Sequence, residues 1–538
     1  MLGQMQDWPL RIGRIIDHAA RYHGKRRILS RAPNGGIVLT DYEGIRHDAL
    51  RIVQGLRRLG ARPGAVIGAM AWNSERHLAV WYGVPGAGCA LHSLNPRLGA
   101  AQLTYIINHA EDAWIFVDPD LVGVLEPLAA ALTGVRGYIV MGAAETTLPN
   151  AITLDELMSG DGDAGWEPVD ERAACGICYT SGTTGEPKGV VYSHRSNTLH
   201  AMAVIQPDTL GLSSRDVVMP VVPLFHANGW SLGFSGPMSG AAMVMPGRQL
   251  DPAGLMEMLG HGVTISAAVP TIWLPLLDHL RETGGSLPDL SRVVIGGSAC
   301  PRAVIEAFQN DYGVRVIHAW GMTETSPLGT LCTEKPEIAA MAPGRRLDQQ
   351  ETVGHPHFTV DFAIRDEAGR DMPWDGRTQG RLMVRGPCVV QRYHKAETAA
   401  ADGEGWFDTG DAAVMDPYGY VRITDRFKDL IKSGGEWISS IDLENAAVGH
   451  PDVAEAAAVA MPHPKWAERP VLVVVPRAGR RPDRTAMLAH LGRQFAKWQL
   501  PDDVVVVEAL PHTATGKISK LTLRAQLEAD GYRLPDLR

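Results

Sequence analysis

The sequence YTSGTTGEPKG occupies residues 179–189 and directly follows the apolar run ACGIC at residues 174–178. Its glycines let the backbone approach an oxyanion, its hydroxyls add donors, and Lys188 brings a mobile positive charge. The stretch is not a Walker A motif, because Glu186 and Pro187 separate the last glycine of the loop from the lysine. We therefore predict a phosphate-binding loop after a buried strand. A flexible Gly/Thr surface turn is the alternative for this stretch taken alone.

Five further segments lie downstream in the order found in one protein family. They are PLFHANGW (223–230), AWGMTETSP (319–327), GWFDTGD (405–411), DRFKDLIKSGGEWISS (425–440) and PHTATGKISK (511–520). Together with 179–189 they resemble the AMP-forming acyl-CoA synthetases of the adenylate-forming superfamily, through nearly the whole chain. GGEWISS, HPKWAERP and the opening MLGQM with HAARYHG look most like the medium- and long-chain fatty acid ligases and the methylmercaptopropionate ligases.

Composition and charge narrow the classes of partner. The chain has 538 residues, 45% of them hydrophobic, and a net charge of −9 at pH 7. This length suggests several structural units. The negative charge argues against a general nucleic-acid or anionic-membrane surface, so a polyphosphate must be held by local cations. We expect no nucleic-acid partner.

Cysteines and apolar runs predict the compartment. The six cysteines are scattered and form no disulfide framework, which fits a reducing environment. Cys175 and Cys178 make a CxxC inside an apolar run, so packing is favoured over a metal or redox role. Runs such as 471–475 are far shorter than the roughly 20 residues needed to cross a bilayer. With no export or lipid signal visible, we expect a cytoplasmic protein without membrane insertion.

Hydrophobic periodicity predicts an α/β fold. From about residue 40 to 345, helical stretches alternate with short apolar runs, as in layered parallel α/β units. Between about 353 and 423, turn sequences separate short strands, which predicts a small β subdomain. A mixed α/β pattern resumes after Asp425. We predict an N-terminal domain over 1–425 and a small mobile C-terminal domain over 426–538.

The resemblance implies an ATP site and a Mg²⁺ site. Glu324 with Thr180 would hold Mg²⁺ bridging phosphate oxygens, and Asp411 would accept hydrogen bonds from both ribose hydroxyls. His318, Ala319 and Thr323 would border the nucleotide or the carboxylate. The full ATP set is Thr180, Ser181, Gly182, Thr183, Thr184, Gly185, Lys188, His318, Ala319, Thr323, Asp411, Arg426 and Lys432.

The resemblance also assigns the reacting groups. Lys517 would reach from the C-terminal domain to the acid oxygen and the α-phosphate, and His226 would lie near the carboxylate. With Glu324 these are the expected catalytic residues. In isolation Glu324 would be a solvated acid, Asp411 a turn former, Lys517 a solvated lysine and His226 a packed core residue.

The resemblance also implies an acyl-binding site and a CoA-binding site. The acyl-binding set is Trp230, Gly297, Trp320 and Trp437, with Trp230 as a gate of the acyl tunnel. Many relatives carry Gly and Tyr where this chain has Ala319 and Trp320, so the local shape differs there. Ser433, Gly434 and Gly435 would bind CoA after the C-terminal domain rotates about a hinge at Lys428.

The sequence therefore predicts an acid–thiol ligase that uses ATP, Mg²⁺ and CoA. Carboxylate and ATP would give acyl-AMP and pyrophosphate, and CoA would then displace AMP. The expected acid is apolar, medium-chain or methylthio-substituted; aryl or phenylpropanoid acids are an alternative. Loading of a carrier-protein thiol and a non-catalytic nucleotide sensor are the other two alternatives. The family habit suggests a homodimer.

Overall fold

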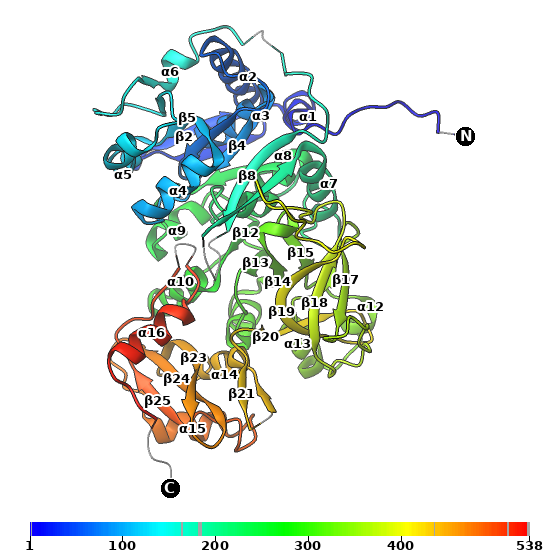
Figure 1. Cartoon of the computed structure of the whole chain (residues 1–538), viewed down its shortest axis with the longest axis vertical. Helices are drawn as coiled ribbons and strands as arrows, with labels where there is room; N and C mark the ends of the chain where they lie inside the picture. The colour runs from blue at the N-terminus through cyan, green and yellow to red at the C-terminus, as the bar shows by residue number, and fades with distance from the viewer. Residues whose placement is uncertain (2, 163–164, 181–185, 435, 514–515, 535–538) are drawn as a thin grey trace.

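A computed structural model of the chain describes residues 1, 3–162, 165–180, 186–434, 436–513 and 516–534. A large N-terminal part contains two large sheets and a four-stranded sheet, and a small C-terminal domain holds a fourth sheet. The C-terminal domain lies at one end of the long axis and the two large sheets lie toward the other (Figure 1). The predicted α/β class is confirmed.

The first large sheet has seven strands in the order β7-β6-β5-β3-β4-β8-β9. All neighbouring strands within this sheet are parallel except β8 and β9, which pair antiparallel. Its strands are β3 (Val66–Met70), β4 (Ala90–Ser93), β5 (Asp112–Val117), β6 (Tyr138–Val140), β7 (Ala151–Thr153), β8 (Ala174–Thr180) and β9 (Lys188–Ser193). The predicted phosphate loop thus joins a buried strand, β8, to an antiparallel partner.

The second large sheet has nine strands in the order β16-β15-β14-β13-β12-β10-β11-β1-β2. Its strands are β1 (Arg27–Arg31), β2 (Ile37–Asp41), β10 (Val217–Pro220), β11 (Ala242–Met245), β12 (Ile265–Ala268), β13 (Arg292–Gly296), β14 (Arg315–Gly321), β15 (Leu328–Leu331) and β16 (His355–Pro356). β1 pairs in parallel with β11, about 200 residues away. Local sequence carries no signal for that pairing.

Amphipathic helices cover these sheets. Helix α2 (Tyr42–Arg58) buries Ile45, Ala49 and Ile52 as the periodicity predicts, and Gly60 follows with φ +75°. The other N-terminal helices are α1 (Gly13–His23), α3 (Glu75–Gly86), α4 (Ala100–Ala110), α5 (Val122–Leu125), α6 (Leu154–Leu157), α7 (His194–Val204), α8 (Leu232–Ser239), α9 (Pro252–Leu259), α10 (Pro270–Thr283), α11 (Arg302–Glu306), α12 (Pro336–Ala339) and α13 (Pro343–Gln350).

The four-stranded sheet is antiparallel throughout, with the order β17-β18-β19-β20. It consists of β17 (Asp361–Arg365), β18 (Gly380–Arg385), β19 (Phe407–Met415) and β20 (Val421–Arg426). The antiparallel pairing of all neighbouring strands agrees with the turn-rich sequence. Residues 355–356, placed in this subdomain by the sequence, pair instead with β15 of the nine-stranded sheet.

The C-terminal domain packs helices on a five-stranded sheet. Its strands are β21 (Ile431–Ser433), β22 (Glu436–Ile438), β23 (Val453–His463), β24 (Ala467–Pro476) and β25 (Asp503–Val506), and its helices are α14 (Ser440–Val448), α15 (Arg484–Leu491) and α16 (Lys520–Ala529). Helix α15 ends at Leu491, with Gly492 as its C-cap residue. Within the described ranges, no helix is both long and apolar enough to span a bilayer.

Candidate active site

A cleft of about 1860 Å³ lies between the two parts of the chain and receives side chains from both. Most of the predicted site residues that the structure describes line it: Thr180, Lys188, His226, Trp230, Gly297, His318, Ala319, Trp320, Thr323, Glu324, Asp411, Arg426, Lys428 and Lys517. Residues Ser181, Gly182, Thr183, Thr184, Gly185 and Gly435 lie outside the described residues. Segments more than 300 residues apart in the chain therefore meet at one cavity.

Parallel strands of the nine-stranded sheet form one wall of the cleft. β12, β13 and β14 run side by side, and Gly296 and Ala319 are register partners at their carboxyl ends. Open α/β sheets present ligand sites at the carboxyl ends of their strands. A Cβ atom on Gly296 would lie 2.7 Å from the Ala319 carbonyl oxygen and 3.1 Å from the Trp230 ring. Only glycine lets these groups approach so closely.

Gly297 lies on the same wall of the cleft, next to Lys517 of the C-terminal domain. Its φ of +81° is in the left-handed region that favours glycine. A Cβ atom there would lie 3.5 Å from Cε of Lys517. The Thr271 hydroxyl, on α10, donates to the carbonyl of Gly516 at 3.4 Å, and Gly516 directly precedes Lys517 in the chain. The Lys517 side chain therefore enters the cleft beside Gly297.

Burial and neighbouring charges shift the pKa of the Lys517 ammonium. Burial and, after it, the positive charge of Arg426 lower its pKa to about 8. The negative charges of Asp411 and Glu324 raise the pKa of Lys517. Removal from water disfavours the charged form, and nearby carboxylates favour it. The cation is thus held among two acids and another cation, all within electrostatic range.

Asp411 is fixed by two donors. β19 and β20 place Asp411 directly opposite Arg426. Arg426 Nε lies 2.7 Å from Oδ1 of Asp411, and Trp320 Nε1 donates to Oδ2 at 2.9 Å. Burial raises the pKa of this carboxyl, while Arg426 and then the Trp320 hydrogen bond lower it. Each carboxylate oxygen keeps acceptor capacity for a further donor.

Lys188 and Glu324 both contact a tyrosine, Tyr393, that the sequence did not single out. Thr180 and Lys188 are register partners that flank the loop between β8 and β9. The Tyr393 hydroxyl donates to Oε1 of Glu324 at 2.8 Å, and Lys188 Nζ lies 5.0 Å from the centroid of the Tyr393 ring. Burial raises the pKa of Glu324. The single aromatic residue in the polar stretch QRYHK was the only available signal for Tyr393.

His226 and Trp230 occupy a segment with unusual backbone angles. Burial, followed by the Lys517 charge, lowers the pKa of His226 to about 3, so its imidazole is neutral at ordinary pH. Ala227, Trp230 and Ser231 have φ of 41°, 52° and 66°. Such conformations cost about 1–3 kcal/mol each in non-glycine residues and cluster at functional sites. The surrounding structure therefore holds the Trp230 indole against Gly296.

The predicted CoA segment and two of its neighbours lie elsewhere. Lys432, Ser433, Gly434 and Trp437 are absent from the lining of the cleft. Lys432 Nζ lies 5.3 Å from the centroid of the Trp437 ring, and the Ser433 hydroxyl accepts a hydrogen bond from Arg469 at 2.9 Å. Arg469, which sequence reasoning missed, also pairs with Asp502 at 2.7 Å.

The donor set fits magnesium carried in with phosphate. Among the described residues there is no group of three or more His, Cys, Asp or Glu able to hold a metal. The Glu324 carboxylate and the Thr180 hydroxyl line the same cleft. Mg²⁺ is commonly bound by one or two carboxylates together with substrate phosphates. Oxygen donors of this number suit such an ion, whereas a self-sufficient metal centre would need more protein ligands.

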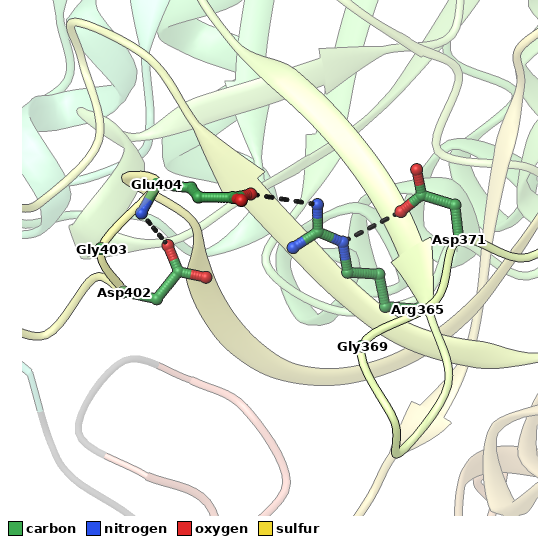
Figure 2. Close-up of a pocket in the computed structure, with 6 residues that line it drawn as sticks. All are labelled: Arg365, Gly369, Asp371, Asp402, Gly403 and Glu404. Atoms are coloured by element: carbon green, nitrogen blue, oxygen red, sulfur yellow. Dashed lines mark hydrogen bonds and ion pairs between the residues drawn. The ribbon is translucent and has the colours of Figure 1, made fainter.

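A second hollow, on the four-stranded sheet, is lined by charged residues whose partners lie within the hollow or beside it (Figure 2). Arg365 lies between Asp371, at 2.9 Å, and Glu404, at 3.9 Å. Arg365 also covers the Trp406 ring, with 4.6 Å between its Cζ and the ring centroid. These contacts tie two hairpins together. The large cleft is therefore the better candidate for chemistry.

Comparison with known proteins gives matches along nearly the whole chain. Residues 16–394 match the family described as AMP-binding enzyme, and residues 442–517 match the AMP-binding enzyme C-terminal domain. The chain is 48% identical over 533 residues to a 3-methylmercaptopropionyl-CoA ligase of Ruegeria pomeroyi, covering 98% of this chain and 99% of the relative. It is 42% identical to a medium-chain-fatty-acid–CoA ligase of Ectopseudomonas oleovorans, covering 97% of each.

A solved structure shares the fold. The anthranilate CoA ligase AuaEII in complex with anthranoyl-AMP superposes with a TM-score of 0.87, covering 98% of this chain and 100% of that one. Its sequence identity to this chain is 22%. At that identity the likeness supports the arrangement of sheets and domains alone.

Proposed function

The chain belongs to the AMP-binding enzyme family, and from this membership we propose that it is an ATP-dependent acyl-CoA ligase acting on an apolar carboxylic acid. The acid would first be converted to acyl-AMP with release of pyrophosphate, and CoA would then take the acyl group. One observation carries the proposal: Lys188, Glu324, Asp411 and Lys517 come from four segments and line one cleft.

The first half-reaction needs charge compensation and alignment. A carboxylate is a poor acyl donor, and transfer to AMP gives it a stable leaving group. We assign Lys188 to the β- and γ-phosphates and Asp411 to the ribose hydroxyls. Lys517, whose side chain passes Gly297, would contact the acid oxygen and the α-phosphate as charge develops there. Preorganised charges of this kind are often the largest catalytic contribution.

Glu324 and Thr180 would hold the magnesium ion, which when bound neutralises charge on the phosphate oxygens. The chain's own contribution is the position of these oxygens: Glu324 is 6% exposed and its carboxylate is held by Tyr393. A buried, oriented acid of this kind loses little freedom when a ligand arrives.

The second half-reaction needs a different arrangement. Lys517 occupies the cleft while Ser433 and Gly434 lie outside it, which supports an adenylate-forming arrangement. A thiol must reach the carbonyl carbon, so we propose that the C-terminal domain turns about Lys428 to withdraw Lys517 and bring Ser433 and Gly434 inward.

The acyl group would extend past Trp230. Apolar residues that line the cleft together with Trp230 include Val221, Val222, Phe225, Ala268, Val269, Ile272 and Leu274. Relatives named for methylmercaptopropionate and for medium-chain fatty acids support a medium-sized apolar or methylthio-substituted acid. Trp320 hydrogen-bonds to Asp411, so we now assign it to the nucleotide side of the cleft instead of the acyl side.

A panel of carboxylic acids tests the proposal. Acids from propionate to palmitate, with methylthio and aryl analogues, are scored by kcat/KM for AMP release with free CoA. A preference for medium-length apolar or methylthio acids is expected. A phosphopantetheinyl carrier protein replaces CoA in a parallel series. Faster transfer to the carrier, or no pyrophosphate exchange with any acid, would contradict the proposal.

A further inference from the structure

Residues 388–394, between β18 and β19, dock on both halves of the proposed triphosphate site. The Val390 N–H donates to the Glu324 carbonyl at 2.8 Å, and the His394 N–H donates to the Gly189 carbonyl at 2.7 Å. The Ser326 hydroxyl donates to the Cys388 carbonyl at 2.7 Å. These contacts connect the start of β9 with the turn that carries Glu324.

Tyr393 lies in the middle of this segment and contacts both charged groups. Its hydroxyl donates to Oε1 of Glu324 at 2.8 Å, and Nζ of Lys188 lies 5.0 Å from its ring centroid. An ammonium over an aromatic face is attracted by the ring quadrupole. The hydroxyl and the ring of one side chain therefore contact an anion and a cation, respectively.

Lys188 and Glu324 do not pair with each other. Within the part of the chain that the structure describes, neither forms an ion pair with N···O of 4.0 Å or less. They are nevertheless close enough for the Lys188 charge to lower the pKa of Glu324. A direct pair would consume the donors of Lys188 and the oxygens of Glu324 that an incoming magnesium–triphosphate complex needs.

We propose that Tyr393 is a positioning residue that holds Lys188 and Glu324 apart, ready for the magnesium-bound triphosphate. The proposal rests on the proposed function, because it concerns the same ATP site. Tyr393 takes no part in bond making. Its hydroxyl orients the Glu324 carboxylate, and its ring face holds the Lys188 ammonium.

Binding of Mg·ATP without the acid tests this role directly. Wild type, Tyr393→Phe and Tyr393→Met are titrated calorimetrically at a temperature at which each is folded by circular dichroism. The Tyr393 hydroxyl orients the Glu324 carboxylate before the ligand arrives, so Tyr393→Phe should raise the Kd of Mg·ATP about tenfold. Tyr393→Met also loses the ring and should raise the Kd further.

Kinetics add a second readout. With saturating acid, the Mg²⁺ concentration that gives half-maximal acyl-AMP formation should rise in Tyr393→Phe, while kcat at saturating Mg²⁺ changes less than about threefold. This split is expected because the interaction acts before the transition state. A crystal structure of Tyr393→Met should show Lys188 and Glu324 within ion-pair distance.

Tyr420→Phe is the matched control. The Tyr420 hydroxyl donates to the Thr333 carbonyl at 2.5 Å, and Lys335 lies 5.3 Å from its ring, but Tyr420 does not line the cleft. Its Mg·ATP Kd should stay at the wild-type value. An unchanged Kd in Tyr393→Phe, or an equal rise in Tyr420→Phe, would overturn the proposal. Wild type that binds no Mg·ATP would instead refute the proposed function.

Discussion

The indole Nε1 of Trp320, at the end of β14, donates a hydrogen bond to Oδ2 of Asp411 on β19 at 2.9 Å. The contact joins the nine-stranded sheet to the four-stranded sheet at the cleft. Because Arg426 binds the other oxygen, the carboxylate plane of Asp411 is fixed by two donors from two strands. A ribose would meet an acceptor that is already oriented.

Replacing Trp320 by Phe is expected to weaken ATP binding. The ring is kept and the N–H is lost, so Asp411 loses a donor worth about 1.5–3 kcal/mol. KM for ATP should rise roughly tenfold, while KM for the acid stays near wild type. Discrimination of ATP against its 2′- and 3′-deoxy analogues should also fall. The control is Trp374→Phe, since Trp374 is 53% exposed. An increase confined to the acid KM would restore Trp320 to the acyl side.

Lys517→Ala should stop acyl-AMP formation and spare the transfer step. Loss of one preorganised electrostatic group typically lowers kcat by about 10²–10³-fold. Pyrophosphate release measures the first step, and CoA attack on supplied acyl-AMP measures the second. The exposed Lys497→Ala serves as the control. Equal loss of both steps would contradict the assigned role of Lys517.

The pKa of Lys517 predicts an alkaline limb for adenylation. With a pKa of about 8 the ammonium is charged below that pH and neutral above it. Since the charged form is the one required, kcat/KM for ATP should fall as pH rises through about 8. Bound polyphosphate favours the cation, so the limb of kcat should lie at higher pH.

Lys517→Arg removes that limb if Lys517 causes it, because a guanidinium stays charged throughout this range. Both profiles are measured by pyrophosphate release under saturating and limiting ATP. A wild-type profile that stays level well above pH 8 would show that Lys517 does not titrate as expected. An arginine variant with the same alkaline limb would show that another group causes it.

Trp230→Ala is expected to shift the acyl preference toward longer chains. The Trp230 indole packs on Gly296 beside the apolar wall of the cleft, and its removal opens space there. Each buried methylene contributes about 0.8 kcal/mol, so two further carbons should gain roughly tenfold in relative kcat/KM. The acid panel measures this shift, with Trp374→Ala as control. An unchanged chain-length profile would exclude Trp230 from the acyl site.

Lys428→Pro should uncouple the two half-reactions. Proline fixes φ at residue 428 and restricts Phe427, so one domain arrangement is retained. In single-turnover measurements one half-reaction should persist while overall turnover falls by at least about tenfold. Lys428→Ala, which leaves the backbone free, should turn over nearly normally. Normal coupling in the proline variant would show that the domains do not turn at this residue.

Local sequence was sufficient for much of the fold. The alternation of helices and short apolar strands from about residue 40 to 345 and the turn-rich β17–β20 region follow from side-chain periodicity and turn residues, which act over a few positions. The motif segments and their order were equally visible, because they combine residue types rarely found together. The predicted metal and nucleotide chemistry depends on residue type and follows from the same segments.

The sequence by itself determined the elements, the family resemblance and the kind of chemistry, since each depends on neighbouring residues. Tertiary structure alone decided which distant side chains meet: β1 with β11, Trp320 with Asp411, and Tyr393 with both Lys188 and Glu324. It also left Ser433 and Gly434 outside the cleft that Lys517 enters. The physical reason is that sheet order and domain packing bring together residues up to hundreds of positions apart, and no local period encodes those contacts.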